Sequence, residues 1–158
     1  CEPDHTAHNE LYDNLSILKK LFKYNKYSVI TNPINNGKEV VIAHDEWGHP
    51  CFFDIDKVNK DDLEDKVKVN STTIDSLVKS MSLQPKFIKI DTEGAEHDVL
   101  EGMKETLKNF KPKIMLEKHP TMIPKHISIE SINKLLEDNN YKATLINKDN
   151  ITIREIWK

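Results

Sequence analysis

One junction most constrains how this chain can fold: an apolar strand is followed at once by an acidic loop and a helix. Residues 86–103 read KFIKIDTEGAEHDVLEGM. The first part has the apolar character of a buried strand, whereas Val99, Leu100 and Met103 recur at helical spacing. A buried strand that leads directly into an amphipathic helix is typical of an α/β fold.

Strand and helix patterns alternate along the rest of the chain. Strands are expected at Tyr27–Thr31, 38–44, 51–55, 67–71, 87–91, 113–117, 141–146 and 151–157. Helices are expected over about Thr6–Lys23, over 72–81 with Thr73 as N-cap, around Val99–Leu107 and over 127–141, and a polar loop is expected at 58–66. Two hairpins are predicted, one over 38–55 and one that closes the chain.

These patterns predict a single α/β domain over residues 1–158. Its sheet should be mostly parallel, covered by helices on both sides, and should end in an antiparallel hairpin. The length suits one domain. The helix near the N-terminus should turn Leu11, Leu15, Leu18 and Phe22 to one face.

Composition and charge exclude some functions and partners. Charged residues make up 31% of the chain and the formal net charge is -3, which argues against a broad nucleic-acid-binding face. No apolar run reaches membrane-spanning length, so no membrane partner is expected. The two cysteines, Cys1 and Cys51, cannot form a disulfide framework, and the default is a reducing, cytoplasmic location.

The acidic residues after the strand 87–91 mark a candidate site. Ligands of α/β sheets bind beyond the carboxyl ends of the strands, where Asp91 is expected. Glu96 and Asp98 are explained by the partial positive charge at the start of a helix. Asp91 is explained less well in this way, because so apolar a strand should hold its carboxylate partly out of water. Asp91 is therefore the leading candidate for a functional residue.

A resemblance to a known family rests on these same residues. The stretch FIKIDTEGAEHDVLEGM contains Asp-x-Glu-Gly-Ala-Glu after a strand and then Val-Leu-x-Gly, and LEKHP follows later. This order resembles the signature region of the FkbM-type methyltransferases, which are class I S-adenosylmethionine-dependent enzymes. The resemblance implies a Rossmann-like methyltransferase sheet, with S-adenosyl-L-methionine as cofactor.

The resemblance also assigns cofactor-binding roles. The opening residues CEPDHTAHNELYDNL are similar to the end of the family's second strand, which implies that Glu2 accepts hydrogen bonds from the cofactor ribose. By the same resemblance Asn32 pairs with the adenine edge, although a plain turn residue beside Pro33 is an equal alternative. Asp91 is the third cofactor-binding candidate.

The reaction that the resemblance implies is O-methylation of a sugar or secondary-metabolite hydroxyl. A hydroxyl needs a general base within hydrogen-bond reach. Asp91, Glu93, His97 and His119 are the candidates, and His119, with Glu117 beside it, is preferred over a loop histidine without a special role. The expected partner is a small-molecule or glycan hydroxyl acceptor.

No metal site is expected. His44 and His49 are five residues apart, which fits no common pair of metal ligands on one helix.

One part of the family pattern is missing from the sequence. The first strand and glycine-rich loop of the family would precede Glu2, and none of the four glycines, Gly37, Gly48, Gly94 and Gly102, lies in such a loop. The sequence is therefore expected to be the C-terminal two-thirds of a methyltransferase domain, inactive without the rest. The alternative is a non-catalytic, methyltransferase-like binding or scaffold module.

Overall fold

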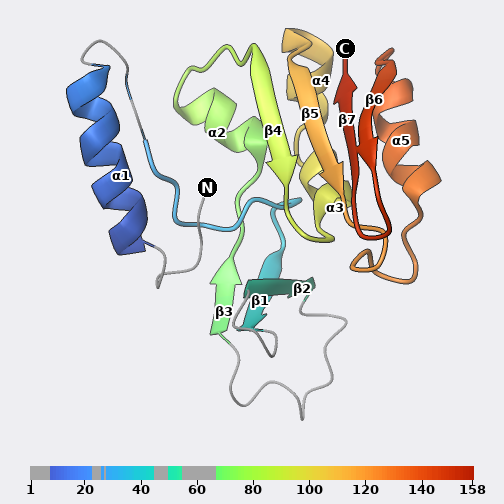
Figure 1. Ribbon diagram of the computed structural model, residues 1–158, viewed down its shortest axis with the longest axis horizontal. Coiled ribbons are helices and arrows are strands. Elements are labelled where there is room, and N and C mark those ends of the chain that lie inside the picture. Colours follow the sequence, from blue (N-terminus) through green and yellow to red (C-terminus); the bar gives the residue numbers. More distant parts are fainter. Residues whose placement is uncertain (1–7, 23–25, 27, 45–49, 55–66) are drawn as a thin grey trace. The chain divides into compact units, whose positions relative to one another are not determined.

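The computed structural model describes residues 8–22, 26, 28–44, 50–54 and 67–158 (Figure 1). The chain separates into two compact units. One contains the described residues of Cys1–Pro33 and Glu39–Asn70, and the other contains Ile34–Lys38 and Ser71–Lys158. The expectation of a single domain stays a prediction.

The first unit contains one helix and a small antiparallel sheet. Helix α1 spans His8–Leu21, and strands β1 (Glu39–His44), β2 (Pro50–Asp54) and β3 (Val67–Asn70) follow in the order β2-β1-β3. The pairing of β1 with β2 confirms the hairpin predicted over 38–55. Residues 28–31 form no strand, so the expectation there is wrong for these residues. Asn32 and then Pro33 follow, and Pro33 lacks the backbone N–H that a strand would need to continue its pairing. The polar loop predicted at 58–66 lies outside the described residues.

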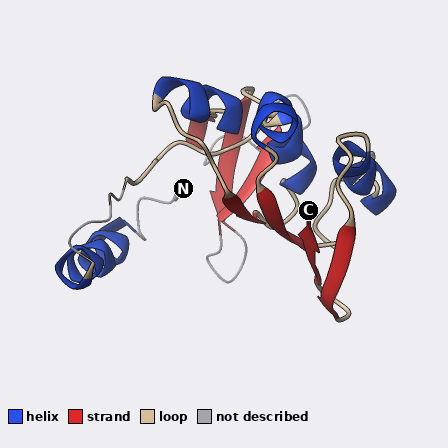
Figure 2. Ribbon diagram, turned by 90° about the horizontal axis from the view of Figure 1, so that it is seen from above, coloured by secondary structure: helices blue, strands red, loops and turns tan. Residues whose placement is uncertain are grey.

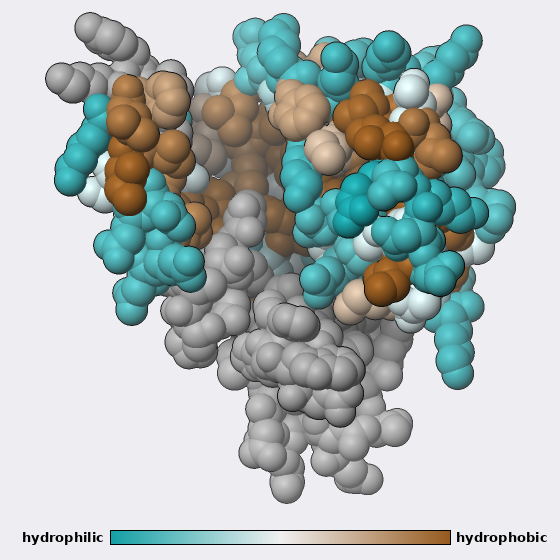
Figure 3. Space-filling view, viewed as in Figure 1, coloured by the Kyte–Doolittle hydropathy of each residue, from teal (hydrophilic) through white to brown (hydrophobic). Residues whose placement is uncertain are grey.

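Helix α1 has the predicted apolar face, but much of it is exposed. Leu18 and Phe22 are 36% and 52% exposed, and Ile17 and Leu21 are exposed as well. Figure 3 shows these apolar side chains gathered along α1. The periodicity predicted the helix correctly, but these apolar side chains of the helix are exposed in the structure.

The second unit is built on a mixed four-stranded sheet. Its strands are β4 (Phe87–Asp91), β5 (Lys113–Lys118), β6 (Ala143–Lys148) and β7 (Ile153–Trp157), in the order β4-β5-β7-β6. Only β4 and β5 are parallel, and β7 runs antiparallel to both of its neighbours. The expectation of a mostly parallel sheet is therefore wrong for the described strands, although the terminal hairpin is confirmed.

Helices cover one face of this sheet. Helices α3 (Glu96–Glu101), α4 (Lys104–Phe110) and α5 (Ile129–Glu137) gather on the same face in Figure 2. The core beneath them is formed by Ile90, Val99, Leu100, Met103, Leu107, Ile114, Leu116, Ile132, Leu136, Tyr141 and Trp157. Alternate residues of β4 point the other way and are exposed, as in a sheet with one solvated face. Helices on both faces were expected, and the described part of this unit has them on one.

Local capping and a glycine determine where the helices begin and break. Helix α2 spans Ile74–Ser80, and the hydroxyl of Thr73 accepts from the backbone N–H of Ser76, which confirms the predicted N-cap. The helix predicted around Val99–Leu107 is instead two helices that break at Gly102. A Cβ on Gly102 would lie 2.3 Å from the carbonyl oxygen of Asn35, so the break accommodates a crossing backbone segment.

Among the described residues, no helix combines the length and the apolar character needed to cross a membrane.

Candidate functional site

Two neighbouring strands bring the candidate residues to one edge of the sheet. Asp91 ends β4, and its register partner across the parallel pair is Glu117, the residue before the last of β5. His119 follows β5 immediately. The carboxyl ends of parallel strands meet at the same edge, as the sequence predicted for Asp91 and His119. By strand alternation Asp91 and Glu117 lie on the face opposite the core.

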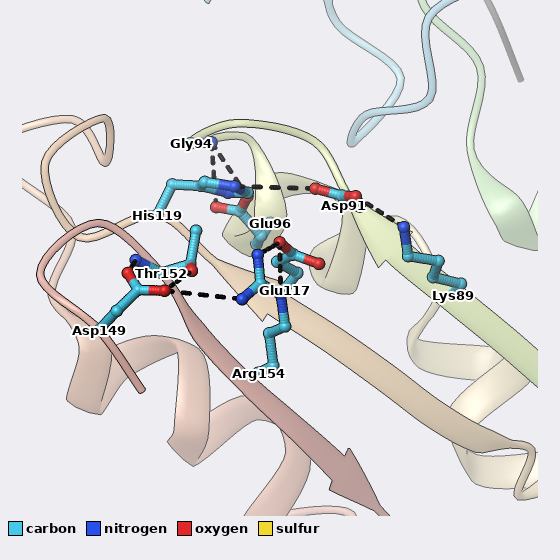
Figure 4. A network of polar contacts seen from close by, with 9 residues as sticks. All are labelled: Lys89, Asp91, Gly94, Glu96, Glu117, His119, Asp149, Thr152 and Arg154. Atoms are coloured by element: carbon cyan, nitrogen blue, oxygen red, sulfur yellow. Dashed lines mark hydrogen bonds and ion pairs between the residues drawn. The ribbon is translucent and has the colours of Figure 1, made fainter. Parts of the chain in front are cut away.

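His119 lies between two carboxylates (Figure 4). Its Nδ1 atom is 3.0 Å from Oε1 of Glu96, and its Nε2 atom is 3.7 Å from Oδ1 of Asp91. Glu96 is fully buried and His119 is 6% exposed, whereas the side chain of Asp91 is 34% exposed. One nitrogen of the imidazole therefore faces the protein interior, and the other faces an accessible edge.

Close packing of two loops creates this contact. Gly94, in the loop after β4, has φ +105°, and a Cβ there would lie 2.4 Å from the carbonyl oxygen of Met122. Met122 belongs to the turn after β5, in which the carbonyl oxygen of His119 accepts from the backbone N–H groups of Met122 and Ile123. Only glycine permits this backbone contact, which places Glu96, two residues on, against His119.

Two cations balance the carboxylates of the edge. Lys89 Nζ lies 2.7 Å from Oδ2 of Asp91, and Arg154 binds Oε1 of Glu117 through Nε at 2.8 Å and Nη2 at 2.6 Å. The hydrogen bond to Glu117 raises the pKa of the Arg154 guanidinium. Arg154 also lies 3.6 Å from Asp149, whose pKa is lowered chiefly because its carboxylate accepts from the backbone N–H of Thr152. The edge thus combines fixed charges of both signs.

Two interpretations of the sequence need correction. Asp91 is not held out of water, because its strand end lies on the uncovered face and Lys89 pairs with it. Glu96 is not a carboxylate that only favours a helix start: it is fully buried and bonds to His119 and to the N–H of Gly94. Sequence reasoning missed Glu96 as a site residue. The one feature of the sequence that could have indicated Glu96 is its position two residues after Gly94, where the backbone of another loop comes close.

Of the remaining predicted residues, Glu93 stays outside this cluster. Glu93 has φ +49°, is exposed, and makes no hydrogen bond or ion pair with the rest of the described chain. Asn32 belongs to the other unit, where its amide donates to the carbonyl of Asn70 at 3.3 Å. Glu2 and His49 lie outside the described residues. The roles of Glu2, Asn32 and Glu93 therefore remain predictions.

Three of the side chains could offer atoms to a metal ion. The ligand atoms of Asp91, Glu117 and His119 lie within 4.8 Å of one another. Lys89 and Arg154, however, already occupy one oxygen of each carboxylate. An added divalent cation would therefore compete with fixed positive charges.

A model of the methyltransferase FkbM domain matches residues 1–143. The chain belongs to the FkbM methyltransferase family.

Solved structures show the same fold in an FkbM protein. The chain is similar to the crystal structure of methyltransferase FkbM from Methylobacillus flagellatus KT, with a TM-score of 0.65 and 17% sequence identity. The likeness covers 99% of this chain and 35% of that protein, so the chain spans about a third of its length. Among curated proteins, none matches the chain significantly. The family membership and this fold confirm the resemblance seen in the sequence.

The second unit also has a pocket that contains neither Asp91 nor His119. It has a volume of about 500 Å³ and lies between α2 and α4, lined among others by Asp75, Val78, Thr106 and Phe110. Asp75 accepts hydrogen bonds from the N–H and hydroxyl of Thr106 there, so its carboxylate is occupied in joining the two helices.

Proposed function

We propose that this FkbM-family chain takes part in S-adenosylmethionine-dependent O-methylation, with a sugar or secondary-metabolite hydroxyl as acceptor. The observation that carries the proposal is the position of His119 Nε2, which faces Asp91 across an accessible strand edge in a member of a methyltransferase family. The Rossmann-like arrangement of the sheet is part of the same proposal.

The donor chemistry of this edge fits the cofactor. S-adenosylmethionine, when bound, supplies an electrophilic methyl group on a sulfonium. Asp91 offers a carboxylate that is acceptor-only and accessible, which suits the hydroxyl groups of a ribose or of an acceptor. Glu2 and Asn32 are proposed to hold the ribose and the adenine.

His119 is proposed as the general base. A bound S-adenosylmethionine would supply the methyl group to the acceptor oxygen and keep the electron pair of its C–S bond on sulfur. The hydroxyl proton passes to Nε2 of His119, the nitrogen that faces Asp91. Imidazole suits this step because its unperturbed pKa, about 6.5, lies near neutral pH.

The proposal is tested with the full native protein in two assays. Calorimetric titration measures S-adenosylmethionine binding, and transfer of a tritiated methyl group is measured on a panel of methyl glycosides and polyketide alcohols. His119→Asn should lower transfer about 100-fold while binding is retained. Asp91→Asn should weaken either binding or turnover, and the two assays distinguish its role at the cofactor from its role at the acceptor.

A matched control and two contrary outcomes complete the test. Asp138→Asn removes a carboxylate of an exposed ion pair on α5 and should change neither assay. Absence of S-adenosylmethionine binding would refute the proposal. Binding without transfer to any acceptor would favour the non-catalytic binding module instead.

A further inference from the structure

Glu96 is a buried carboxylate that the proposed methyl transfer does not yet use. It is 0% exposed, and among the described residues no Lys or Arg pairs with it. Its partners are the N–H of Gly94, at 3.0 and 3.2 Å from its two oxygens, and Nδ1 of His119. A carboxylate removed from water without a cation is costly, so its contacts demand an explanation.

The hydrogen-bond inventory assigns the protons. An ionised carboxylate can only accept, so the 3.0 Å contact requires a hydrogen on Nδ1 of His119. In the neutral imidazole Nε2 then carries the lone pair. Nε2 lies 3.7 Å from Oδ1 of Asp91, which is longer than a hydrogen bond. Two acceptors therefore lie side by side at an accessible edge, where a hydroxyl that approaches them can donate its one hydrogen to Nε2.

We propose that Glu96 is the positioning residue of His119. Glu96 fixes the tautomer that carries hydrogen on Nδ1. In this tautomer Nε2 is the proton acceptor, and it faces the accessible strand edge beside Asp91. This inference rests on the proposed function for its catalytic meaning, although the tautomer itself can be measured without turnover.

The substitution Glu96→Gln tests the proposal with almost no change of shape. The buried N–H of Gly94 needs an oxygen, and Gln has one where Glu has two. With the amide oxygen at the position of Oε2, which lies 3.2 Å from the N–H of Gly94, the NH₂ takes the position of Oε1, 3.0 Å from Nδ1, and donates to it. The preferred tautomer should then reverse, with hydrogen on Nε2, which can no longer accept a proton.

The first readout is the nitrogen chemical shifts of the His119 ring, which NMR measures from pH 5 to pH 9. The sample is the full native protein, and S-adenosylmethionine alone is the probe. His119→Asn assigns the signals. The groups that face the ring are Asp91 from β4, Glu96 from α3 and Glu117 from β5. The neutral ring of the native protein should carry hydrogen on Nδ1, and that of Glu96→Gln on Nε2. The control is Asp98→Asn, which removes a carboxylate from the same helix and should leave the native tautomer unchanged.

The second readout is methyl transfer to the acceptor panel. Glu96→Gln should lower kcat about 100-fold with little change in KM. Glu96→Asp, which keeps an acceptor-only group, should recover part of that loss. Asp98→Asn should keep the native rate.

The possible outcomes distinguish failure of this inference from failure of the proposed methyl transfer. An unchanged tautomer in Glu96→Gln, or a ring that stays doubly protonated up to pH 9, would overturn the positioning role even if the native protein transfers methyl groups. A reversed tautomer in a protein that transfers no methyl group would support the role of Glu96 in orienting the ring while the proposed function fails.

Discussion

Lys118 Nζ lies 2.7 Å from Oε2 of Glu155 on the helix-covered face of the sheet. Lys118 is 1% exposed and also donates to Oδ1 of Asn133 at 2.8 Å, and its Nζ lies 5.7 Å from the centre of the Trp157 ring. Trp157 donates its indole N–H to the same oxygen of Glu155. The ammonium is thus buried with a full set of partners, and its stability depends on all of them.

Removing one partner of this pair should destabilise the fold strongly. Glu155→Gln leaves the buried Lys118 without its counter-charge, and we expect a loss of about 3 kcal/mol in the free energy of unfolding. Lys134→Met, in the exposed ion pair of α5, should cost much less. Urea denaturation with unchanged m-values measures both, and equal costs would show that the burial of Lys118 has no energetic consequence.

Gly94→Ala should reduce both stability and methyl transfer. Gly94 and Gly37 have φ of +105° and +89°, so alanine meets similar backbone strain at both, about 1 kcal/mol or more. Only at Gly94 does the new Cβ meet a backbone oxygen, 2.4 Å away on Met122, because the nearest atom to Gly37 is a methyl group of Thr73 at 3.2 Å. Thermal unfolding of the two variants should show the larger loss for Gly94→Ala, with a displaced His119 and slower transfer. Similar losses would contradict this account of the loop contact.

Tyr141 should make the fold sensitive to alkaline pH. Tyr141 is 4% exposed, its hydroxyl has no hydrogen-bond partner within the part of the chain that the structure describes, and burial raises its pKa to about 12. The unfolded chain ionises this phenol near pH 10, so it binds fewer protons than the folded chain between about pH 10 and pH 12. Stability is therefore lost as pH rises through this range.

Tyr141→Phe tests that relation. Removing a buried hydroxyl without a partner should be neutral or slightly stabilising at pH 7, because no hydrogen bond is lost. The variant should also lose less stability than the native protein between about pH 10 and pH 12. Denaturation series at pH 7 and at alkaline pH measure both effects. A variant less stable at pH 7 would mean that the hydroxyl has a partner after all.

Methyl transfer should be insensitive to EDTA. Lys89 and Arg154 each occupy an oxygen of the carboxylates Asp91 and Glu117, so the edge is balanced by side-chain cations. We expect the same rate before and after dialysis against EDTA. A loss of rate that Mg²⁺ or Mn²⁺ restores would instead assign the cluster of Asp91, Glu117 and His119 to a metal.

Residue patterns along the chain were enough to predict most of the secondary structure of the second unit and the place of the candidate site. Strands β4 and β5, the closing hairpin and the Thr73 cap follow from periodicity and capping, which depend on residues close together in the chain. The same local pattern placed Asp91 and His119 at one strand edge, because parallel strands end together.

Only the tertiary structure decided which of the acids is buried. Glu96 and His119 are 23 residues apart, and their contact depends on the packing of Gly94 against Met122. The sheet direction was likewise undetermined, since an apolar strand pattern is compatible with parallel and antiparallel neighbours. Whether a carboxylate is exposed, as Asp91 is, or removed from water, as Glu96 is, depends on which distant backbone segments cover it, and the pattern of neighbouring residues carries no information about them.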